Sequence, residues 1–377
     1  MEFRDLKKQY KILKSEIDEA IASVIEKSNF ISGKQVEELE KQLANYVGVK
    51  HCITCGNGTD ALSMMMMAWG IKEGDAVFVP DFTFFASAEV IAFENATPVF
   101  YDVDENTFNA DVSSLERAIE KVKSEKILTP KAIIAVDLFG QPANYVEIEK
   151  VAKKYGLLLL EDAAQGFGGK IGEKRAGSFG DAATTSFFPA KPLGCYGDGG
   201  AIFINDDKIA EDLRSIRVHG KGEYKYDNVR IGWNSRLDTI QAAILQIKFN
   251  AFRTCELEAV NKVADQYTKL LTGVVKTPVV AENMCSSWAQ YTIQVSSKEE
   301  RDKLQNYLKE EGIPTMIYYP KAMHQQQAFE TNKIYEACPV AEKLCNVSLS
   351  LPMHPYLETE EIFKIVKKIK KFFELRK

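Results

Sequence analysis

The chain has 377 residues, which exceeds the usual size of one compact core and favours two domains, or a large domain with a smaller one attached. Its formal net charge of -5 gives no overall basic surface, so we expect no nucleic acid as a partner. No apolar run approaches the roughly 20 residues that span a bilayer, and the first residues lack the basic start and apolar stretch of a signal peptide. A cytoplasmic protein without membrane partners is the simplest interpretation.

The seven cysteines are scattered through the chain, which predicts reduced thiols rather than a disulfide framework. Cys52 and Cys55 have the CxxC spacing of redox pairs and of half a zinc site. The other cysteines offer no second close pair. We therefore expect no metal site and interpret Cys52 and Cys55 as small buried residues near a turn.

Two amphipathic helices are predicted at the start of the chain, over residues 5–28 and 32–47, and Gly48 stands where the second would stop. Short apolar runs then alternate with helical segments, at residues 77–79, 98–101, 132–136, 157–160 and 201–204. This alternation predicts an α/β fold, in which helices cover both faces of a mostly parallel sheet.

The pattern changes after about residue 245. A long helical stretch over 242–271 precedes a strand at 290–295, a helix near 301–311 and a basic terminal helix over 362–377. We expect a large domain over residues 1–250 and a smaller α+β domain over 251–377. The terminal helix has one apolar face, and packing of this face on its own domain is a better interpretation than contact with a membrane.

Lys191 is the strongest candidate for a catalytic residue. It stands between two prolines in a run of hydroxyl, aromatic and glycine residues over 184–200. Burial disfavours the ammonium form of a lysine, and a neutral amine can form a Schiff base with a carbonyl compound. Ser186 precedes it by five residues, so a turn would place the hydroxyl and the amine near opposite ends of one small cofactor.

Two further stretches contain candidate ligands. Small polar residues over 55–62 lead into a predicted helix, where backbone amides and the Thr59 hydroxyl would form a phosphate cradle, although an ordinary turn with a helix cap is the alternative. Glu161 and Asp162 follow four leucines that predict a buried strand, and parallel sheets bind ligands at the C-terminal ends of their strands. A helix cap or a salt bridge is the alternative there, above all for Glu161.

Pyridoxal 5'-phosphate would use all of these groups. It needs a lysine for its aldehyde, an acid for its ring nitrogen, a phosphate cup and an aromatic side chain against its ring. As a carboxylate, Asp162 would keep the ring nitrogen protonated. Phe84 is a candidate for the aromatic contact, and its position suits one core aromatic among several equally well.

Six motifs, in order along nearly the whole chain, resemble those of the DegT/DnrJ-type nucleotide-sugar aminotransferases. They lie at residues 56–62, 161–165, 186–191, 197–200, 234–238 and 350–355. Within that family, residues 186–203 look most like those of the enzymes that aminate UDP-2-acetamido-2-deoxy-3-oxo-D-glucuronate at C3.

This resemblance implies a fold-type I aminotransferase that works as a homodimer with active sites at the subunit interface. Lys191 matches the Schiff-base lysine and Asp162 the partner of the pyridine nitrogen. The other matching positions are Gln165 beside the ring hydroxyl, Gly58, Thr59 and Ser186 at the phosphate, Phe84 on the ring, Asn234 reaching the phosphate from the other subunit, and Arg236, Tyr319 and His324 for the sugar nucleotide. Tyr318 departs from the histidine that many relatives have there.

The implied reaction is ping-pong. L-Glutamate leaves its amino group on the cofactor and departs as 2-oxoglutarate, a nucleotide-linked keto sugar then takes the amino group, and Lys191 moves the proton in both halves. The product would serve bacterial surface polysaccharide synthesis. A dTDP-linked 3-keto-6-deoxyhexose is the second choice of substrate, and a 4-keto sugar the third.

Two other functional classes are alternatives. Related PLP-dependent sugar dehydratases carry histidine in place of the lysine, so Lys191 speaks against that class. A non-catalytic regulatory homologue is the other alternative, against which the combination of Lys191, Asp162 and Thr59 speaks.

Overall fold

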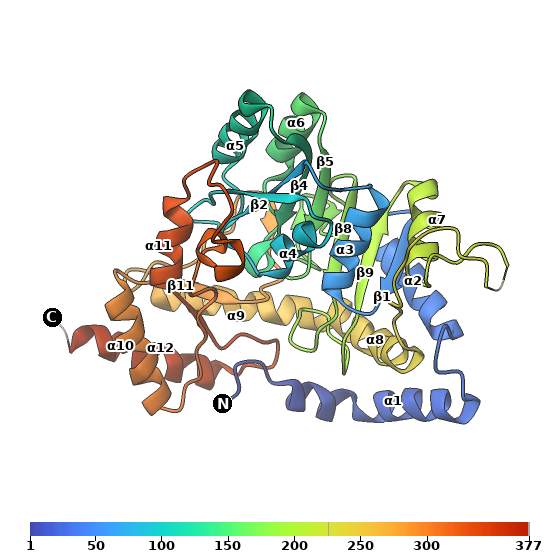
Figure 1. Ribbon diagram of the computed structural model, residues 1–377. Coiled ribbons are helices and arrows are strands. Elements are labelled where there is room, and N and C mark those ends of the chain that lie inside the picture. Colours follow the sequence, from blue (N-terminus) through green and yellow to red (C-terminus); the bar gives the residue numbers. More distant parts are fainter. Residues whose placement is uncertain (225, 376–377) are drawn as a thin grey trace.

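The computed structural model describes residues 1–224 and 226–375 (Figure 1). Its centre is a seven-stranded sheet with the strand order β1-β9-β8-β5-β4-β2-β3. The strands are β1 (His51–Cys55), β2 (Asp75–Pro80), β3 (Thr97–Tyr101), β4 (Thr129–Val136), β5 (Leu158–Asp162), β8 (Ala182–Ser186) and β9 (Gly200–Ile204). Strand β9 pairs antiparallel with both of its neighbours, and the other pairings are parallel. The predicted mostly parallel sheet is confirmed.

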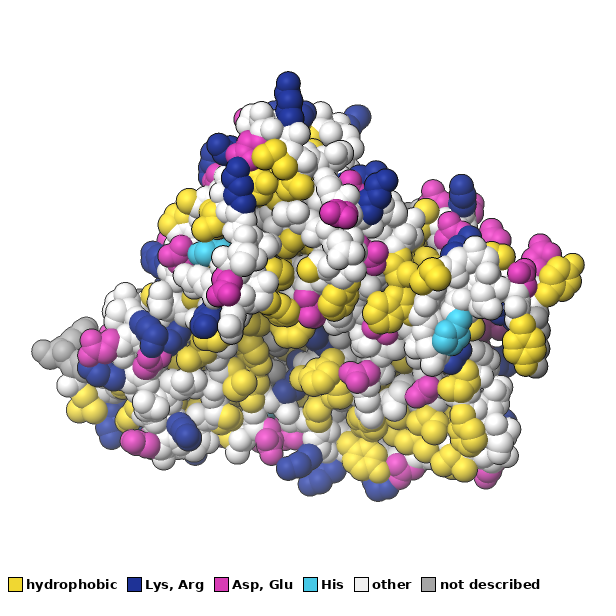
Figure 2. Space-filling model, viewed as in Figure 1, with side chains coloured by type: hydrophobic (Ala, Val, Ile, Leu, Met, Phe, Trp, Pro, Cys, Tyr) yellow, Lys and Arg dark blue, Asp and Glu magenta, His cyan; other side chains and the backbone are white. Residues whose placement is uncertain are grey.

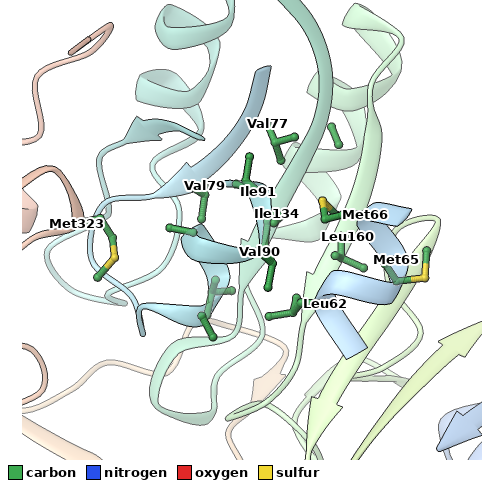
Figure 3. Close-up of a cluster of buried hydrophobic side chains, with 14 of the residues drawn as sticks. Leu62, Met65, Met66, Val77, Val79, Val90, Ile91, Ile134, Leu160 and Met323 are labelled. Carbon is green, nitrogen blue, oxygen red and sulfur yellow. The ribbon is translucent and has the colours of Figure 1, made fainter. Parts of the chain in front are cut away.

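Helices cover both faces of this sheet (Figure 1). One face packs against α3 (Gly58–Ala68), α4 (Ala86–Phe93) and α7 (Asp207–Ile216), and the other against α2 (Lys34–Val47), α5 (Val112–Glu125), α6 (Tyr145–Tyr155) and α8 (Thr239–Ala251). Alternation along β2 explains the two cores, because Val77 and Val79 face α3 and α4 while Ala76 and Phe78 face α5 and α6. Figure 3 shows the first of these cores.

The two N-terminal helices agree with the sequence prediction. Helix α1 (Leu6–Lys27) begins at Asp5, whose carboxylate accepts the Lys8 N–H, and it packs along α8. Helix α2 ends at Gly48, whose φ of 90° only glycine adopts without strain. Cys52 and Cys55 lie buried in β1 as free thiols, which confirms their interpretation as small buried residues.

A second, C-terminal group of elements has its own core. Helix α8 continues through a π-helical segment (Phe252–Glu256) into α9 (Leu257–Leu271), so the predicted division at residue 250 lies near the end of α8, and it stays a prediction. Beyond it come β11 (Tyr291–Gln294) paired antiparallel with β12 (Ser348–Leu351), α10 (Lys298–Glu310), α11 (Pro339–Val347) and α12 (Thr359–Glu374). The short strands β6 (Lys170–Ile171), β7 (Lys174–Arg175) and β10 (Met284–Cys285) form a small sheet of their own.

The terminal helix confirms its preferred interpretation as far as it is described. Its apolar face is buried in the C-terminal core, through Ile362, Ile365, Val366, Ile369 and Phe372. Residues 376–377 of the predicted helix lie outside the described part of the chain. Within that part, no helix is both long enough and apolar enough to cross a membrane.

Candidate active site

The candidate site lies at the edge of the sheet where β5 and β8 end and α3 begins. Asp162 is the last residue of β5, Ser186 is the last residue of β8, and Gly58 is the first residue of α3. Parallel strands bring their C-terminal ends to one edge, which is why residues more than 100 positions apart in sequence meet there. A surface cavity of about 590 Å³ lined by Asp104, Asn109 and Asp111 contains none of the predicted site residues.

The start of α3 contains the residues that the sequence predicts to bind phosphate. Asn57 caps the helix by accepting the Asp60 N–H at 2.8 Å, and Gly58 and Thr59 present the first turn, partly exposed. A Cβ atom on Gly58 would lie 2.7 Å from the Ser186 Cβ, so glycine is what allows this close approach. Free backbone amides at a helix N-terminus attract anions, and here a serine hydroxyl group lies beside them.

Asp162 is buried, with 5% of its surface exposed. Ser87 Oγ donates a hydrogen bond to its Oδ2 at 2.8 Å, and the Ala164 N–H donates to its Oδ1 at 3.1 Å. Burial raises the pKa of Asp162, while the hydrogen bonds from Ser87 and Ala164 and the charge of Lys191 act in the opposite direction. The sequence reasoning did not assign Ser87, although it lies only three residues after Phe84.

Lys191 lies in the loop between β8 and β9, which folds back on itself. Its N–H donates to the Phe188 carbonyl at 2.9 Å, and the Cys195 N–H donates to the Phe187 carbonyl at 2.8 Å. Burial lowers the pKa of Lys191, and the nearby charge of Asp162 raises it. The loop therefore brings the amine close enough to the buried carboxyl group for their charges to interact.

Gln165, Tyr319 and Phe84 form one further group at this edge. Gln165 is buried, its Oε1 accepts the Phe139 N–H at 2.8 Å, and its Nε2 donates to the Tyr319 hydroxyl at 3.1 Å. The Tyr319 ring lies 6.3 Å from the Phe84 ring, measured between centroids. Phe84 is 52% exposed, so it is not a core aromatic and its ring is open to a ligand.

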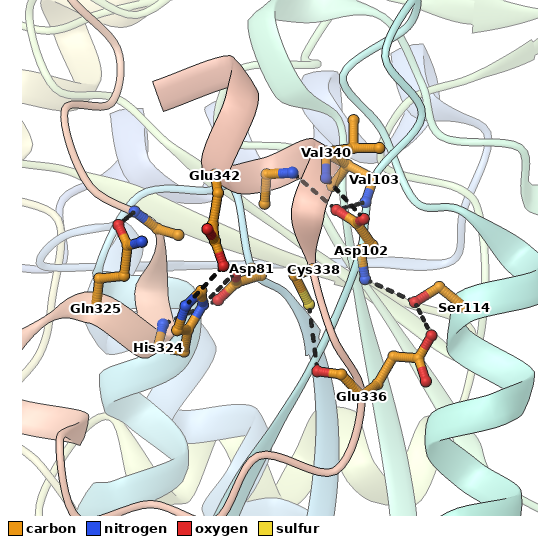
Figure 4. A network of polar contacts seen from close by, with 12 residues as sticks. Asp81, Asp102, Val103, Ser114, His324, Gln325, Glu336, Cys338, Val340 and Glu342 are labelled. Atoms are coloured by element: carbon orange, nitrogen blue, oxygen red, sulfur yellow. Dashed lines mark hydrogen bonds and ion pairs between the residues drawn. The ribbon is translucent and has the colours of Figure 1, made fainter. Parts of the chain in front are cut away.

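His324 is held between carboxylates (Figure 4). Its Nδ1 lies 2.6 Å from Oδ2 of the fully buried Asp81, its backbone N–H donates to Asp81 Oδ1 at 2.9 Å, and its Nε2 lies 3.4 Å from Glu342 Oε1. The hydrogen bond with Asp81 raises the pKa of His324. His324 thereby fastens the segment that carries Tyr319 to the end of β2. Its predicted contact with a sugar stays a prediction.

Asn234 and Arg236 lie on a loop that contacts the start of α3 through the residue between them. Ser235 Oγ accepts the Gly56 N–H at 2.8 Å and donates to Asp60 Oδ2 at 2.6 Å. Asn234 is exposed and accepts a hydrogen bond from the Arg236 guanidinium. The sequence reasoning did not assign Ser235, and the motif over 234–238 was the only signal that pointed to this loop.

A model of the DegT/DnrJ/EryC1/StrS aminotransferase family matches residues 11–370. The UDP-2-acetamido-2-deoxy-3-oxo-D-glucuronate aminotransferase of Pseudomonas aeruginosa is 45% identical over 365 residues, which are 96% of this chain and 97% of that protein. A pleiotropic regulatory protein of Geobacillus stearothermophilus is 45% identical over 374 residues, which are 98% of this chain and 97% of that protein.

Solved structures agree with the family match. A DegT DnrJ EryC1 StrS aminotransferase from Brucella abortus superposes with a TM-score of 0.96 at 49% identity, covering 99% of both chains. NtdA from Bacillus subtilis, solved with bound cofactor PMP, superposes with a TM-score of 0.87 at 26% identity, covering 96% of this chain and 82% of that one. The chain therefore belongs to the DegT/DnrJ/EryC1/StrS aminotransferase family.

Proposed function

We propose that this family member uses pyridoxal 5'-phosphate to move the amino group of L-glutamate to a nucleotide-linked keto sugar. The first choice of acceptor is C3 of UDP-2-acetamido-2-deoxy-3-oxo-D-glucuronate, the sugar in the name of the Pseudomonas aeruginosa relative. One observation carries the proposal: Lys191 lies within electrostatic reach of the buried Asp162, at the sheet edge where Gly58 meets Ser186.

The residues at this edge fit the cofactor. The first turn of α3, with Gly58, Thr59 and Ser186, suits its phosphate, and the buried Asp162 suits a protonated ring nitrogen. The exposed ring of Phe84 is open to a stacked aromatic ligand. When bound, pyridoxal phosphate supplies an electron sink for the electrons released when the substrate Cα–H bond breaks.

The protein's own residues would do the remaining work. Lys191 would hold the cofactor covalently and, once displaced by an amino donor, move a proton at the substrate carbon, since burial lowers its pKa and favours the neutral amine. Ser87 would keep Asp162 oriented through its hydrogen bond to Oδ2. Gln165 would hold Tyr319 in place at the opposite side of the site.

We propose that a second subunit completes the site. Asn234 is exposed on a loop whose apolar side chains also face solvent, with Tyr224 73%, Val229 57% and Ile231 85% exposed. Figure 2 shows hydrophobic side chains on this projecting loop and on the neighbouring surface over α1. Large exposed apolar patches mark interfaces, and a homodimer would bury this one. The family resemblance assigns Asn234 to the partner's phosphate site in such a dimer.

The identity of the sugar is tested by direct assay. The purified protein is incubated with pyridoxal phosphate, L-glutamate and each candidate keto sugar, and products are followed by mass spectrometry. An amino sugar from UDP-2-acetamido-2-deoxy-3-oxo-D-glucuronate supports the first choice. Turnover of a dTDP-linked 3-keto-6-deoxyhexose, or of a 4-keto sugar, with no product from the glucuronate would reject it.

Arg236 is the proposed contact for an anionic part of the substrate, because arginine forms bidentate hydrogen bonds with carboxylate and phosphate groups.

A regulatory role is the second candidate, and the name of the Geobacillus stearothermophilus relative is the observation that favours it. Absence of any amino-group transfer from L-glutamate, in protein that has bound the cofactor, would favour that role. A cytoplasmic location remains a prediction from the sequence.

A further inference from the structure

We propose that Arg4 is a positioning residue that fixes the main chain at Lys191 and places a permanent positive charge beside it. The inference rests on the proposed role of Lys191 as the cofactor-binding lysine. It gives the N-terminal segment, which precedes the first helix, a part in the chemistry of a loop that lies almost 190 residues further along the chain.

The contact itself is direct. Arg4 Nη2 donates a hydrogen bond to the Lys191 carbonyl at 2.8 Å and lies 3.4 Å from the Pro192 carbonyl. Pro192 has no N–H to donate within the loop. The loop also turns sharply here, as the close approach of Gly194 to Pro189 shows: a Cβ atom on Gly194 would lie 2.5 Å from the Pro189 carbonyl oxygen. Arg4 therefore supplies hydrogen bonds to carbonyl groups inside the irregular loop between β8 and β9.

The N-terminal segment is anchored on both sides of Arg4. The Phe3 carbonyl accepts the Met353 N–H at 3.1 Å, and the Phe3 ring lies 6.3 Å from the Tyr318 ring. On the other side, Lys8 Nζ donates to the Tyr356 carbonyl at 3.0 Å. Because the C-terminal elements hold the residues on both sides of Arg4, its side chain is held in place against the Lys191 carbonyl.

Several charged groups act on Lys191 and Arg4. Lys191 faces Asp162 and Arg4: burial lowers the pKa of Lys191, Asp162 raises it, and Arg4 lowers it. Burial lowers the pKa of Arg4 to about 10, so Arg4 stays charged at neutral pH. The groups that face Arg4 itself are Glu256, Tyr356, Lys248 and His354.

Glu256 is the acid in this group, and it is already engaged. It accepts the Gln9 amide N–H at 2.8 Å and the Tyr356 hydroxyl. Lys248 is 2% exposed, lies over the Tyr196 ring at 4.8 Å, and burial lowers its pKa to about 8. Glu256 raises the pKa of Arg4 through its charge, so it offsets part of the positive charge that Arg4 and Lys248 place in this region.

Two substitutions separate charge from contact. Arg4→Gln keeps an N–H donor and removes the charge, whereas Arg4→Lys keeps the charge and loses the planar fork that reaches both carbonyls. The holoenzymes are titrated with acid and base while the visible absorbance of the lysine-bound cofactor reports its protonation. We expect the midpoint to move to higher pH in Arg4→Gln and to stay at the wild-type value in Arg4→Lys.

The half-reaction with L-glutamate, followed in a stopped-flow instrument, gives the second readout. We expect it to slow about fivefold in Arg4→Lys, the equivalent of one hydrogen bond of average strength. Arg253→Gln is the control, since Arg253 is an exposed arginine whose side chain contacts Asn250 and not the Lys191 loop.

The outcomes are distinguishable from those that concern the proposed function. If the wild-type protein gives no lysine–cofactor absorbance, the proposed function fails. If it does, and Arg4→Gln titrates with the wild-type midpoint, the role of Arg4 is overturned. Should Arg4→Gln fail to fold, Arg4→Lys decides alone: an unchanged midpoint with a slower half-reaction supports the role, and a wild-type rate contradicts it.

Discussion

Asp162 shows how a single buried residue can depend on distant parts of the chain. Its two oxygens accept hydrogen bonds from Ser87, 75 residues earlier, and from the backbone of Ala164. Burial raises the pKa of this carboxyl group, so each donor helps to keep it ionised. Thr83 lies 3.2 Å from Ser87 and extends the same chain of hydroxyl groups.

Removing the Ser87 hydroxyl tests this contact. We expect Ser87→Ala to lower kcat/KM about five- to tenfold, because a hydrogen bond to a charged acceptor contributes about 1.5 kcal/mol or somewhat less in a partly compensated site. Steady-state kinetics with L-glutamate measure the effect. Ser87→Thr, which keeps the hydroxyl, is the matched control, and equal kinetics for Ser87→Ala and wild type would contradict the role.

The residue types at this site could be read from the sequence, but most of their partners could not. The acid after the leucine run and the lysine between prolines stood out because their local settings are unusual. The pairing of Gln165 with Tyr319 joins residues 154 positions apart and leaves no local pattern. Ser87 and Ser235 are ordinary serines in sequence, and only the fold gives them their partners.

At the scale of elements, the strands with apolar runs were predicted and the polar ones were not. Strand β8 consists of Ala182–Ser186 and carries hydroxyls at its buried centre. Thr185 Oγ1 donates to the Ala163 carbonyl at 3.1 Å, and Thr184 Oγ1 donates to the Glu161 carbonyl at 3.3 Å. These bonds satisfy the polar groups inside the sheet, which is why a strand without an apolar run is stable there.

The segment that joins Tyr319 to the end of β2 has a pH dependence of its own. The hydrogen bond to Asp81 raises the pKa of His324 in the folded protein. The contribution of this contact to stability is therefore complete below the unfolded-state pKa of about 6.5 and is lost as the pH rises through the folded-state pKa. Asp81 and Glu342 contact its ring, and Asp102 lies near.

We therefore expect the difference in melting temperature between wild type and His324→Gln to be largest at acid pH and to shrink toward alkaline pH. Thermal melts across the range measure it. A difference that does not vary with pH would show that the charge of His324 does not contribute.

For the whole molecule, acid is expected to destabilise the junction between the N-terminal segment and the C-terminal elements. His354 is 3% exposed, its Nδ1 has no hydrogen-bond partner among the described residues, and burial lowers its pKa to about 4. Because the pKa of His354 is lower in the folded state, its stabilising contribution is present above a pH of about 6.5, the unfolded pKa. This contribution is lost as the pH falls through about 4.

His354→Gln should flatten this dependence. Between neutral pH and pH about 4, wild type should lose up to about 3 kcal/mol more unfolding free energy than the variant. Urea unfolding at a series of pH values measures both. If the unfolding free energies of the two proteins fall equally with pH, His354 is not the cause of the acid sensitivity.

The proposed shared active site gives a second prediction for the whole assembly. Lys191→Ala and Asn234→Ala are each expected to be inactive or nearly so as homodimers. If Asn234 acts in the partner's site, a mixed dimer has both defects in one site and none in the other. An equal mixture, unfolded and refolded together, should then recover about a quarter of wild-type activity by random pairing. No recovery, with mixed dimers present, would contradict the shared site.

The central claim is that Lys191 is the residue that binds the cofactor. The most direct measurement is the visible absorbance of the lysine-bound cofactor after wild type, Lys191→Ala and Lys248→Met are loaded with pyridoxal 5'-phosphate. Lys248→Met is the control for loss of a different lysine, one that is buried. We predict that the absorbance is present in wild type and Lys248→Met and absent in Lys191→Ala. Its persistence in Lys191→Ala would contradict the assignment.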